Sequence, residues 1–281
     1  NRLKFGFIME KDAGESLRHF SKSAGFDFLT AHFYLKDYSH FLKDLVIGDF
    51  VPSMGQGLIA HNDFAARKSP LINNIIRGGR FIRPYNSVSE NSFYRGIAFS
   101  LRAIHGIETS LFVSNKRRDA NLVRDSLATK NKVYISSLPL SGNHRTDNEL
   151  ADRRSARLFA TGGRIALKLE NTSIAVNALL HQFEHPIQRE NKAHKLFRFE
   201  GSHLFNLSLD FNHRYRNINF FGESAYASSS AMAVLSGVLI GLHRNINLSI
   251  LYRNYPRNYN ALDPNAFGEY ASVNNERGIY M

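Results

Sequence analysis

The sequence has no cysteine and no tryptophan among its 281 residues, and proline is scarce, with 7 residues. Without cysteine the chain can form no disulfide framework, no thiol nucleophile and no cysteine-ligated metal centre. The absence suits a protein of a cell envelope but does not establish that location, because many cytosolic proteins also lack cysteine.

Long hydrophobic runs are missing as well. No stretch of about 18 apolar residues occurs, so the sequence contains no candidate for a membrane-spanning helix. The mean hydropathy is slightly negative. That value does not exclude a membrane barrel, because each barrel strand shows lipid only every second side chain. Hydrophobic residues make up 43% of the chain, which is too many for a disordered protein.

The sequence does contain a recurrent alternation of large apolar side chains with small polar ones. In residues 205–212, Phe and Leu alternate with Asn, Ser and Asp, and residues 246–253 repeat the pattern. This period of two predicts β-strands. We expect strands at residues 2–9, 28–36, 44–51, 93–103, 107–114, 132–137, 164–170, 173–181, 205–212, 216–227, 231–242 and 246–253. Residues 277–281 look like the start of another strand, and a helix is expected at about 63–77.

Short turns alternate with long polar links in this pattern, as is typical of outer-membrane barrels. The short turns lie at 170–172 and 243–245, and the long links at 10–25, 60–92, 115–131, 138–162, 183–202 and 254–276. We therefore predict one all-β domain over residues 1–281, an antiparallel transmembrane β-barrel of about 12 or more strands with long polar loops on one side. Both ends of the chain read as strand, so we expect the barrel to be incomplete at both ends.

A soluble β-sandwich is the alternative, because its strands also alternate apolar and polar residues. Three features favour the barrel. The strands are longer than the usual five or six residues, and the side chains on their polar faces are short and uncharged. Aromatic residues also gather near strand ends, as an interfacial girdle requires. The aromatic pairs are Phe33 with Tyr34, Phe93 with Tyr94, Phe220 with Phe221, and Tyr252 with Tyr255.

Several phrases of the sequence carry a family resemblance. They are Gly48-Asp49-Phe50, Gly55-Gln56-Gly57-Leu58, Ile82-Arg83-Pro84-Tyr85, Glu90-Asn91-Ser92-Phe93-Tyr94-Arg95-Gly96, Asp119-Ala120, His144-Arg145-Thr146 with Glu149, Phe267-Gly268-Glu269 and Asn275-Glu276-Arg277-Gly278. In this order they resemble Bacteroidota-type helix-hairpin-helix-domain-containing outer-membrane β-barrel proteins. The resemblance implies an outer-membrane location and a longer protein, with a helix-hairpin-helix segment before the barrel that this chain lacks. It implies no particular activity.

Basic residues outnumber acidic ones by 36 to 24, which gives a net charge of +12. Arg77, Arg80 and Arg83 recur at every third position, and guanidinium groups suit phosphates and carboxylates. We predict an anion-binding site or a charge network in the barrel lumen, formed by Arg77, Arg80, Arg83, Glu90, Arg95, Arg145 and Glu149. Internal pairing with Glu90, Asp119, Asp147 and Glu149 is favoured over binding of an external anion.

No metal or cofactor is expected. His181 and His185 have the spacing of helical zinc ligands, but their neighbours alternate as a strand, on which they would lie about 13 Å apart. We therefore expect these histidines at solvated loop ends. Gly55-Gln56-Gly57 fits neither nucleotide-binding glycine pattern. The segment Ser141 to Asp147 contains the residue types of a hydrolase, but neighbours in one loop rarely form a catalytic triad.

The sequence thus predicts a non-enzymatic protein of the outer membrane of a Gram-negative bacterium, acting as a pore, a transporter or an assembly platform. Its expected partners are outer-membrane lipid, lipopolysaccharide and other envelope proteins. A DNA-binding or DNA-uptake role is the alternative, motivated by the charge and the family resemblance. An outer-membrane esterase or lipase using Ser141 and His144 is a weaker alternative.

Overall fold

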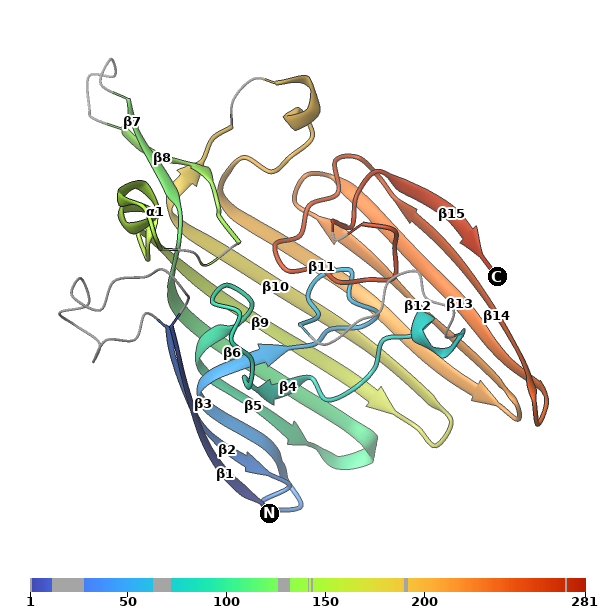
Figure 1. Ribbon diagram of the computed structural model, residues 1–281. Coiled ribbons are helices and arrows are strands. Elements are labelled where there is room, and N and C mark those ends of the chain that lie inside the picture. Colours follow the sequence, from blue (N-terminus) through green and yellow to red (C-terminus); the bar gives the residue numbers. More distant parts are fainter. Residues whose placement is uncertain are drawn as a thin grey trace.

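The computed structural model describes residues 2–11, 28–62, 72–125, 132–140, 142, 144–189, 192–270 and 272–281. Its strands form one 15-stranded sheet. The sheet curves like part of a barrel wall, and several connecting loops fold into its concave side (Figure 1). We call this concave side the lumen.

The strands cover most of the described chain. They are β1 (Leu3–Glu10), β2 (Phe28–Lys36), β3 (Leu42–Pro52), β4 (Ile82–Pro84), β5 (Tyr94–Arg102), β6 (Ile107–Arg118), β7 (Asn121–Asp125), β8 (Lys132–Ser137), β9 (Ala156–Lys168), β10 (Thr172–Ile187), β11 (Gly201–Tyr215), β12 (Ile218–Ala227), β13 (Ala231–His243), β14 (Ile246–Tyr255) and β15 (Glu276–Tyr280). The all-β prediction is confirmed, and each of the expected strand segments falls on an observed strand.

The wall follows the order β1-β2-β3-β5-β6-β9-β10-β11-β12-β13-β14-β15, with β4 beside β3 and β7 beside β8. Neighbours along the wall pair antiparallel, and the one parallel pairing between described strands joins Ile135 of β8 to Ile187 of β10. β1 and β15 are the two edges, and within the described residues they do not pair with each other, so the sheet is open.

Helical structure is minor in the described residues. It consists of α1 (Asp147–Asp152) and three 3-10 turns, Ile72–Ile75, Ile104–Gly106 and Ala193–Lys195. Of the helix expected at 63–77, residues 63–71 lie outside the described residues, and only the single turn at Ile72–Ile75 is observed. None of these helices is long and apolar enough to cross a membrane.

The alternating sequence places apolar side chains on the convex face of the sheet. In β11, Leu209 is 52% exposed, whereas its neighbour Asp210 is 5% exposed. Phe205, Leu207 and Phe211 share the exposed row, and Asn206 and Ser208 share the buried one. The arrangement inverts that of a soluble sheet, in which the large apolar row is buried.

Loops form the hydrophobic core together with the inner face of the wall. Residues 53–62 and 256–270 enter the lumen, where Met54, Leu58 and Tyr259 are fully buried. They pack with wall residues that include Phe112 of β6 and Phe221 of β12. Apolar packing in this molecule therefore lies between the wall and its luminal loops.

Several strands extend beyond their predicted limits, among them β11, which spans Gly201–Tyr215. β6 continues to Arg118, β9 begins at Ala156, and β10 continues to Ile187. The end of β6 reads as a polar link because its inward side chains there are Lys116 and Arg118 instead of small residues. The short strands β4 and β7 fall inside predicted links, as does α1.

The predicted aromatic girdle is only partly correct. Tyr34, Tyr94, Phe221 and Tyr255 are buried on the luminal side. Adjacent residues of a strand point to opposite faces of the sheet, so a consecutive aromatic pair cannot place both rings outside. Phe220, in contrast, is 42% exposed.

Candidate functional site

The predicted anion-binding residues do not gather at one place. Arg77 is buried, and its guanidinium donates from Nε to the carbonyl of Asn265 at 3.0 Å and from Nη1 to that of Asn74 at 2.6 Å. Its backbone N–H also donates to the Gln56 side chain at 2.9 Å. Arg77 therefore joins three luminal segments to one another.

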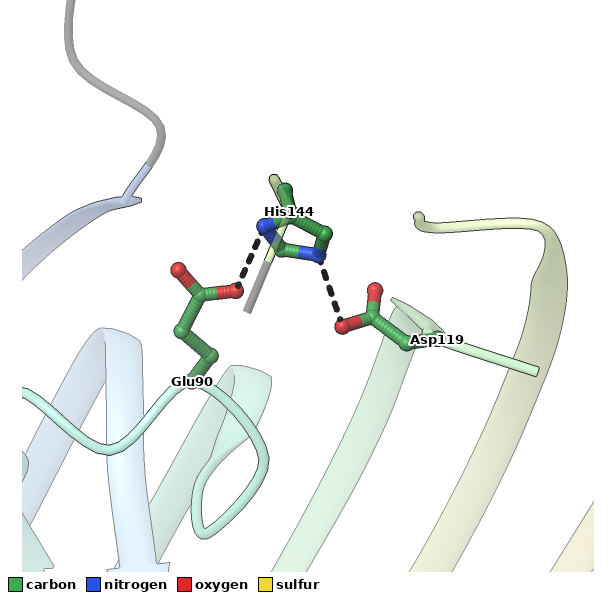
Figure 2. Close-up of side chains that lie close together, drawn as sticks. All are labelled: Glu90, Asp119 and His144. Carbon is green, nitrogen blue, oxygen red and sulfur yellow. Dashed lines mark hydrogen bonds and ion pairs between the residues drawn. The ribbon is translucent and has the colours of Figure 1, made fainter. Parts of the chain in front are cut away.

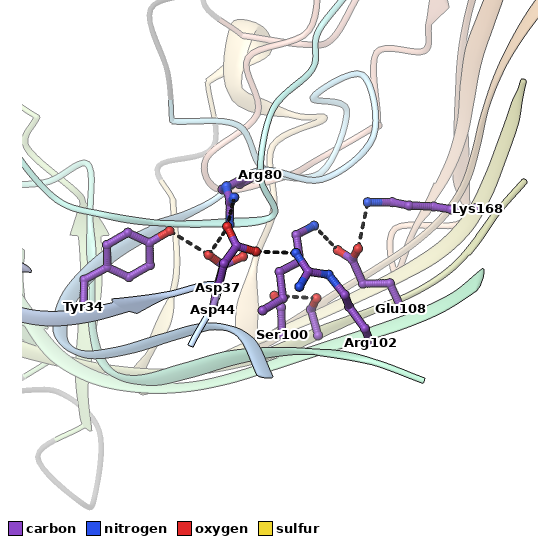
Figure 3. Close-up of polar contacts among 10 residues, drawn as sticks. Tyr34, Asp37, Asp44, Arg80, Ser100, Arg102, Glu108 and Lys168 are labelled. Atoms are coloured by element: carbon purple, nitrogen blue, oxygen red, sulfur yellow. Dashed lines mark hydrogen bonds and ion pairs between the residues drawn. The ribbon is translucent and has the colours of Figure 1, made fainter. Parts of the chain in front are cut away.

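Arg80 belongs to a different cluster, at the short-turn end of the sheet (Figure 3). It donates to Asp44 of β3 at 2.6 Å and to Asp37 at 2.7 Å. These partners differ from the predicted carboxylates Glu90, Asp119, Asp147 and Glu149. Hydrogen bonds from Arg80 and Arg102 lower the pKa of Asp37 to about 2.

The same cluster continues across the neighbouring strands (Figure 3). Glu108 of β6 accepts from Lys43 at 2.6 Å and from Lys168 at 2.8 Å. Next to it, the Ser110 hydroxyl donates to that of Ser100 at 2.7 Å. The sequence pattern predicts an uncharged luminal face. The structure instead places paired charges there, and these link β3, β6 and β9.

Arg95 and Arg145 lie outside both the Arg77 contacts and the Arg80 cluster, and they do not lie together. Arg95 of β5 holds Asp49 of β3 through two hydrogen bonds of 2.6 and 2.9 Å. The backbone N–H of Arg145 donates to Glu149 at 2.8 Å. Glu149 completes a capping box with Thr146 at the start of α1. Backbone N–H groups of Thr146 and Arg145 lower the pKa of Glu149.

Glu223 of β12 fixes the luminal loop 53–62 to the wall. Its Oε2 accepts from the backbone N–H groups of Gln56 at 2.7 Å and Leu58 at 3.0 Å, and the side chain is buried. Gly55 approaches so closely that an added Cβ would lie 2.6 Å from the Glu223 carboxyl carbon. The Tyr259 hydroxyl donates to the Leu58 carbonyl at 3.0 Å from the opposite loop. Loop 53–62 is thus held from two sides.

A cavity of about 950 Å³ remains between the wall and the luminal loops. Its charged lining residues in the described chain are Lys4, Lys36, Arg80, Arg83, Arg118 and the single carboxylate Asp263. Asp263 accepts from the Tyr94 hydroxyl at 2.7 Å and lies 3.5 Å from Arg118. Positive charge therefore exceeds negative charge around this cavity, and two of the predicted residues, Arg80 and Arg83, line it.

Glu90, Asp119 and His144 form a second cluster near the long-loop end (Figure 2). The His144 ring lies between the two carboxylates, with Nε2 3.1 Å from Asp119 and Nδ1 3.9 Å from Glu90. Burial alone would lower the pKa of His144, but the hydrogen bond to Asp119 and the two negative charges outweigh it and raise the pKa.

This cluster does not have the arrangement of a metal centre. Its three ligand atoms lie within 4.8 Å of one another. However, the two carboxylates face different ring nitrogens, so one ion on either side of the ring would meet only one of them. Ser141, the nucleophile of the hydrolase alternative, lies outside the described residues.

The histidines considered for zinc are placed differently from expectation. His181 and His185 lie on β10, as the alternation predicts, but His181 is not at a solvated loop end. It is fully buried, and its Nε2 lies 2.9 Å from the Tyr94 hydroxyl. The strand continues past His181 to Ile187, and the alternation places His181 in the buried, luminal row with Leu179 and Phe183.

Sequence reasoning missed Glu223 and Asp263, which hold the luminal loops. Glu223 carries a usable signal, because a lone carboxylate on the small, polar face of an alternating strand must find partners in the lumen. Asp263 lies in a long loop and carries no such signal.

Comparisons with known proteins add little to this geometry. No protein-family model matches the chain, and no curated protein matches it in sequence. Among solved structures, the chain is similar to a mutant of the Rh. blastica porin, with 12% sequence identity and a TM-score of 0.28. The match covers 90% of this chain and 80% of that one.

Proposed function

We propose that the chain forms wall and luminal loops of an outer-membrane β-barrel in a Gram-negative bacterium. The observation that carries the proposal is the inverted sheet, with exposed rows of Phe, Leu, Ile and Val outside and Asp, Glu, Asn and Arg inside. A soluble monomer rarely exposes contiguous apolar patches beyond about 600 Å². A barrel in lipid requires this inversion.

The outer row of β6 marks where the apolar band stops. Leu111 and Val113 are exposed and apolar, whereas the next outward residues are Asn115 and Arg117. Arg157 of β9 is the neighbour of Arg117 in the sheet. A change from apolar to charged residues along the outer face supports a lipid boundary near the long-loop end.

Within this proposal, the barrel acts as a selective pore or transporter and not as an enzyme. Loops 53–62 and 256–270 fill much of the lumen, which leaves the basic cavity as the space for a solute. Basic linings favour anions in pores. We also propose lipopolysaccharide and other envelope proteins as partners, and a relationship to the helix-hairpin-helix-domain-containing family. DNA uptake and ester hydrolysis are the alternative functions.

Purification and one pair of variants test the membrane assignment. We expect the protein to fractionate with outer membranes, to need detergent, and to give a β-rich circular dichroism spectrum. Leu209→Arg should lower the free energy of unfolding in bilayers by about 2–4 kcal/mol. The matched control Asn171→Arg, in the exposed turn before β10, should have little effect.

A monodisperse, detergent-free protein that tolerates Leu209→Arg would defeat the membrane assignment. The transport assignment is tested separately, by the reversal potential of the reconstituted protein in a salt gradient. Anion preference is expected, and cation preference would contradict it.

A further inference from the structure

The basic cavity contains two lysines that lie close together. Lys4 of β1 is directly opposite Tyr34 of β2, and Lys36 is two residues further along the same face. Diagonal neighbours of this kind have Cβ atoms about 7–8 Å apart. Both lysines line the cavity. Two adjacent ammonium groups repel each other, and an anion between them would relieve that repulsion.

The nearby carboxylate has other partners, which bind one of its two oxygens. Lys36 faces Asp44 in the register of β2 and β3. Asp44, however, accepts from the Tyr34 hydroxyl and from Arg80, each at 2.6 Å. Neither Lys4 nor Lys36 forms an ion pair within the described part of the chain. The two ammonium groups are therefore available to a ligand.

Part of the remaining lining is neutral and offers hydrogen-bonding groups. Asn86, Ser272 and Asn274 line the cavity, and their side chains make no hydrogen bond to other described residues. Amides and hydroxyls both donate and accept, so they match a ligand with many hydroxyl groups. A cavity of about 950 Å³ lies within the usual range of small-molecule sites.

Aromatic rings in the lining are not arranged for base stacking. Tyr34, Tyr85 and Tyr259 are all buried, with their hydroxyls bound to Asp44, the Ser89 carbonyl and the Leu58 carbonyl. Proteins that bind single-stranded nucleic acid stack bases on exposed aromatic side chains. The lining therefore favours a hydroxyl-rich anion over a nucleic acid.

We propose that this cavity binds an acidic saccharide, a short sugar chain that carries carboxylate or phosphate groups. Lys4 and Lys36 hold its charge, and Asn86 and Asn274 hold its hydroxyls. The inference rests on the proposed barrel, because it takes the cavity to be luminal. Phe5 and Phe33 form a ring pair on the opposite face of the same strands, with centroids 5.1 Å apart. Because the cavity lies on the luminal side of these strands in the proposed barrel, we expect the ligand to come from solution and not from the lipid-facing side.

Calorimetry on the purified full chain in detergent tests the proposal, with trigalacturonic acid as the probe. We expect binding that weakens with salt, and binding of neutral maltotriose at least about tenfold weaker. The double variant Lys4→Gln/Lys36→Gln should weaken trigalacturonate binding by about tenfold or more. The control Arg214→Gln/Arg244→Gln removes the same charge from exposed positions outside the cavity and should bind normally.

Several results would overturn the proposal. They are absence of trigalacturonate binding, equal binding of inorganic phosphate, and an unchanged lysine double variant that retains its circular dichroism spectrum. Lipopolysaccharide binding that depends on Lys4 and Lys36, in a protein that does not bind trigalacturonate, would assign the site to lipid. Oligothymidylate binding that depends on Lys4 and Lys36 would assign it to nucleic acid. If the protein needs detergent and is β-rich but does not bind the saccharide, this inference is refuted and the barrel assignment is still supported.

Discussion

At the scale of single residues, His144 should make the stability of the protein depend on pH. Its folded pKa lies above the ordinary value of 6.5, whereas the pKa of Asp119 lies below its ordinary value of 3.8. Burial would raise the pKa of Asp119, but hydrogen bonds from His144 and from the Arg154 backbone N–H outweigh that effect. The pair therefore contributes most stability when His144 is protonated and Asp119 is ionised.

The sign of the dependence follows from proton linkage. A raised histidine pKa gives stability that is present below 6.5 and lost as the pH rises through the folded pKa. The lowered pKa of Asp119 gives stability that is lost only in strong acid, as the pH falls through its folded pKa.

We predict that His144→Gln reduces the loss of stability that the native protein shows as the pH rises from about 6 through the folded pKa of His144. At the lower pH the variant should be less stable by about 1–2 kcal/mol, because an ionised hydrogen bond is lost. Urea unfolding in detergent measures both quantities. Parallel pH profiles for the native protein and the variant would show that the His144–Asp119 pair does not contribute to the pH dependence.

At the scale of elements, the contact between Glu223 of β12 and loop 53–62 holds this loop in the lumen. Glu223→Ala leaves the buried N–H groups of Gln56 and Leu58 without their acceptor. We expect a loss of stability on the order of 3 kcal/mol, faster proteolysis of loop 53–62 and a larger single-channel conductance.

Two variants serve as references for that experiment. Glu223→Gln keeps an acceptor oxygen and should lie between the native protein and Glu223→Ala. Glu170→Ala removes an exposed carboxylate from the turn before β10 and should change neither stability nor conductance. If Glu223→Ala conducts and unfolds like Glu170→Ala, the contact does not hold the loop.

An element could be predicted from the sequence where the residues that determine it lie close together in the chain. β11 could be predicted because its eight-residue alternation is a local pattern that is the same in sequence and structure. The end of β6 could not, because Lys116 and Arg118 look like a loop until their luminal burial is known. The placement of loop 53–62 depends on Glu223, 167 residues from Gln56 in the sequence.

The candidate site was predictable only in part for the same reason. The arginine spacing indicates Arg80 and Arg83 as anion-binding residues, and both line the cavity. Lys4 and Lys36 carry no comparable motif, and only the pairing of β1 with β2 brings them together. Arg77, which belongs to the same motif, holds loops together instead, and its partner Asn265 is 188 residues away in the sequence.

At the scale of the whole molecule, the curved sheet separates two environments. Its convex side presents rows of exposed apolar residues, and its lumen contains the charge pairs, the loops and the basic cavity. A water-soluble sheet of this size would bury its apolar rows, since each square ångström removed from water contributes about 25 cal/mol. The central claim is that lipid covers the convex rows.

Site-directed spin labelling tests that claim directly, because the chain has no cysteine of its own. Single cysteines at residues 205–211 of β11 would be labelled with a nitroxide in protein reconstituted into bilayers. Accessibility to oxygen, which concentrates in lipid, should peak at Phe205, Leu207, Leu209 and Phe211, where accessibility to a water-soluble nickel chelate should be lowest. Chelate accessibility that peaks at those four positions would show that the convex face meets water, and would contradict the account.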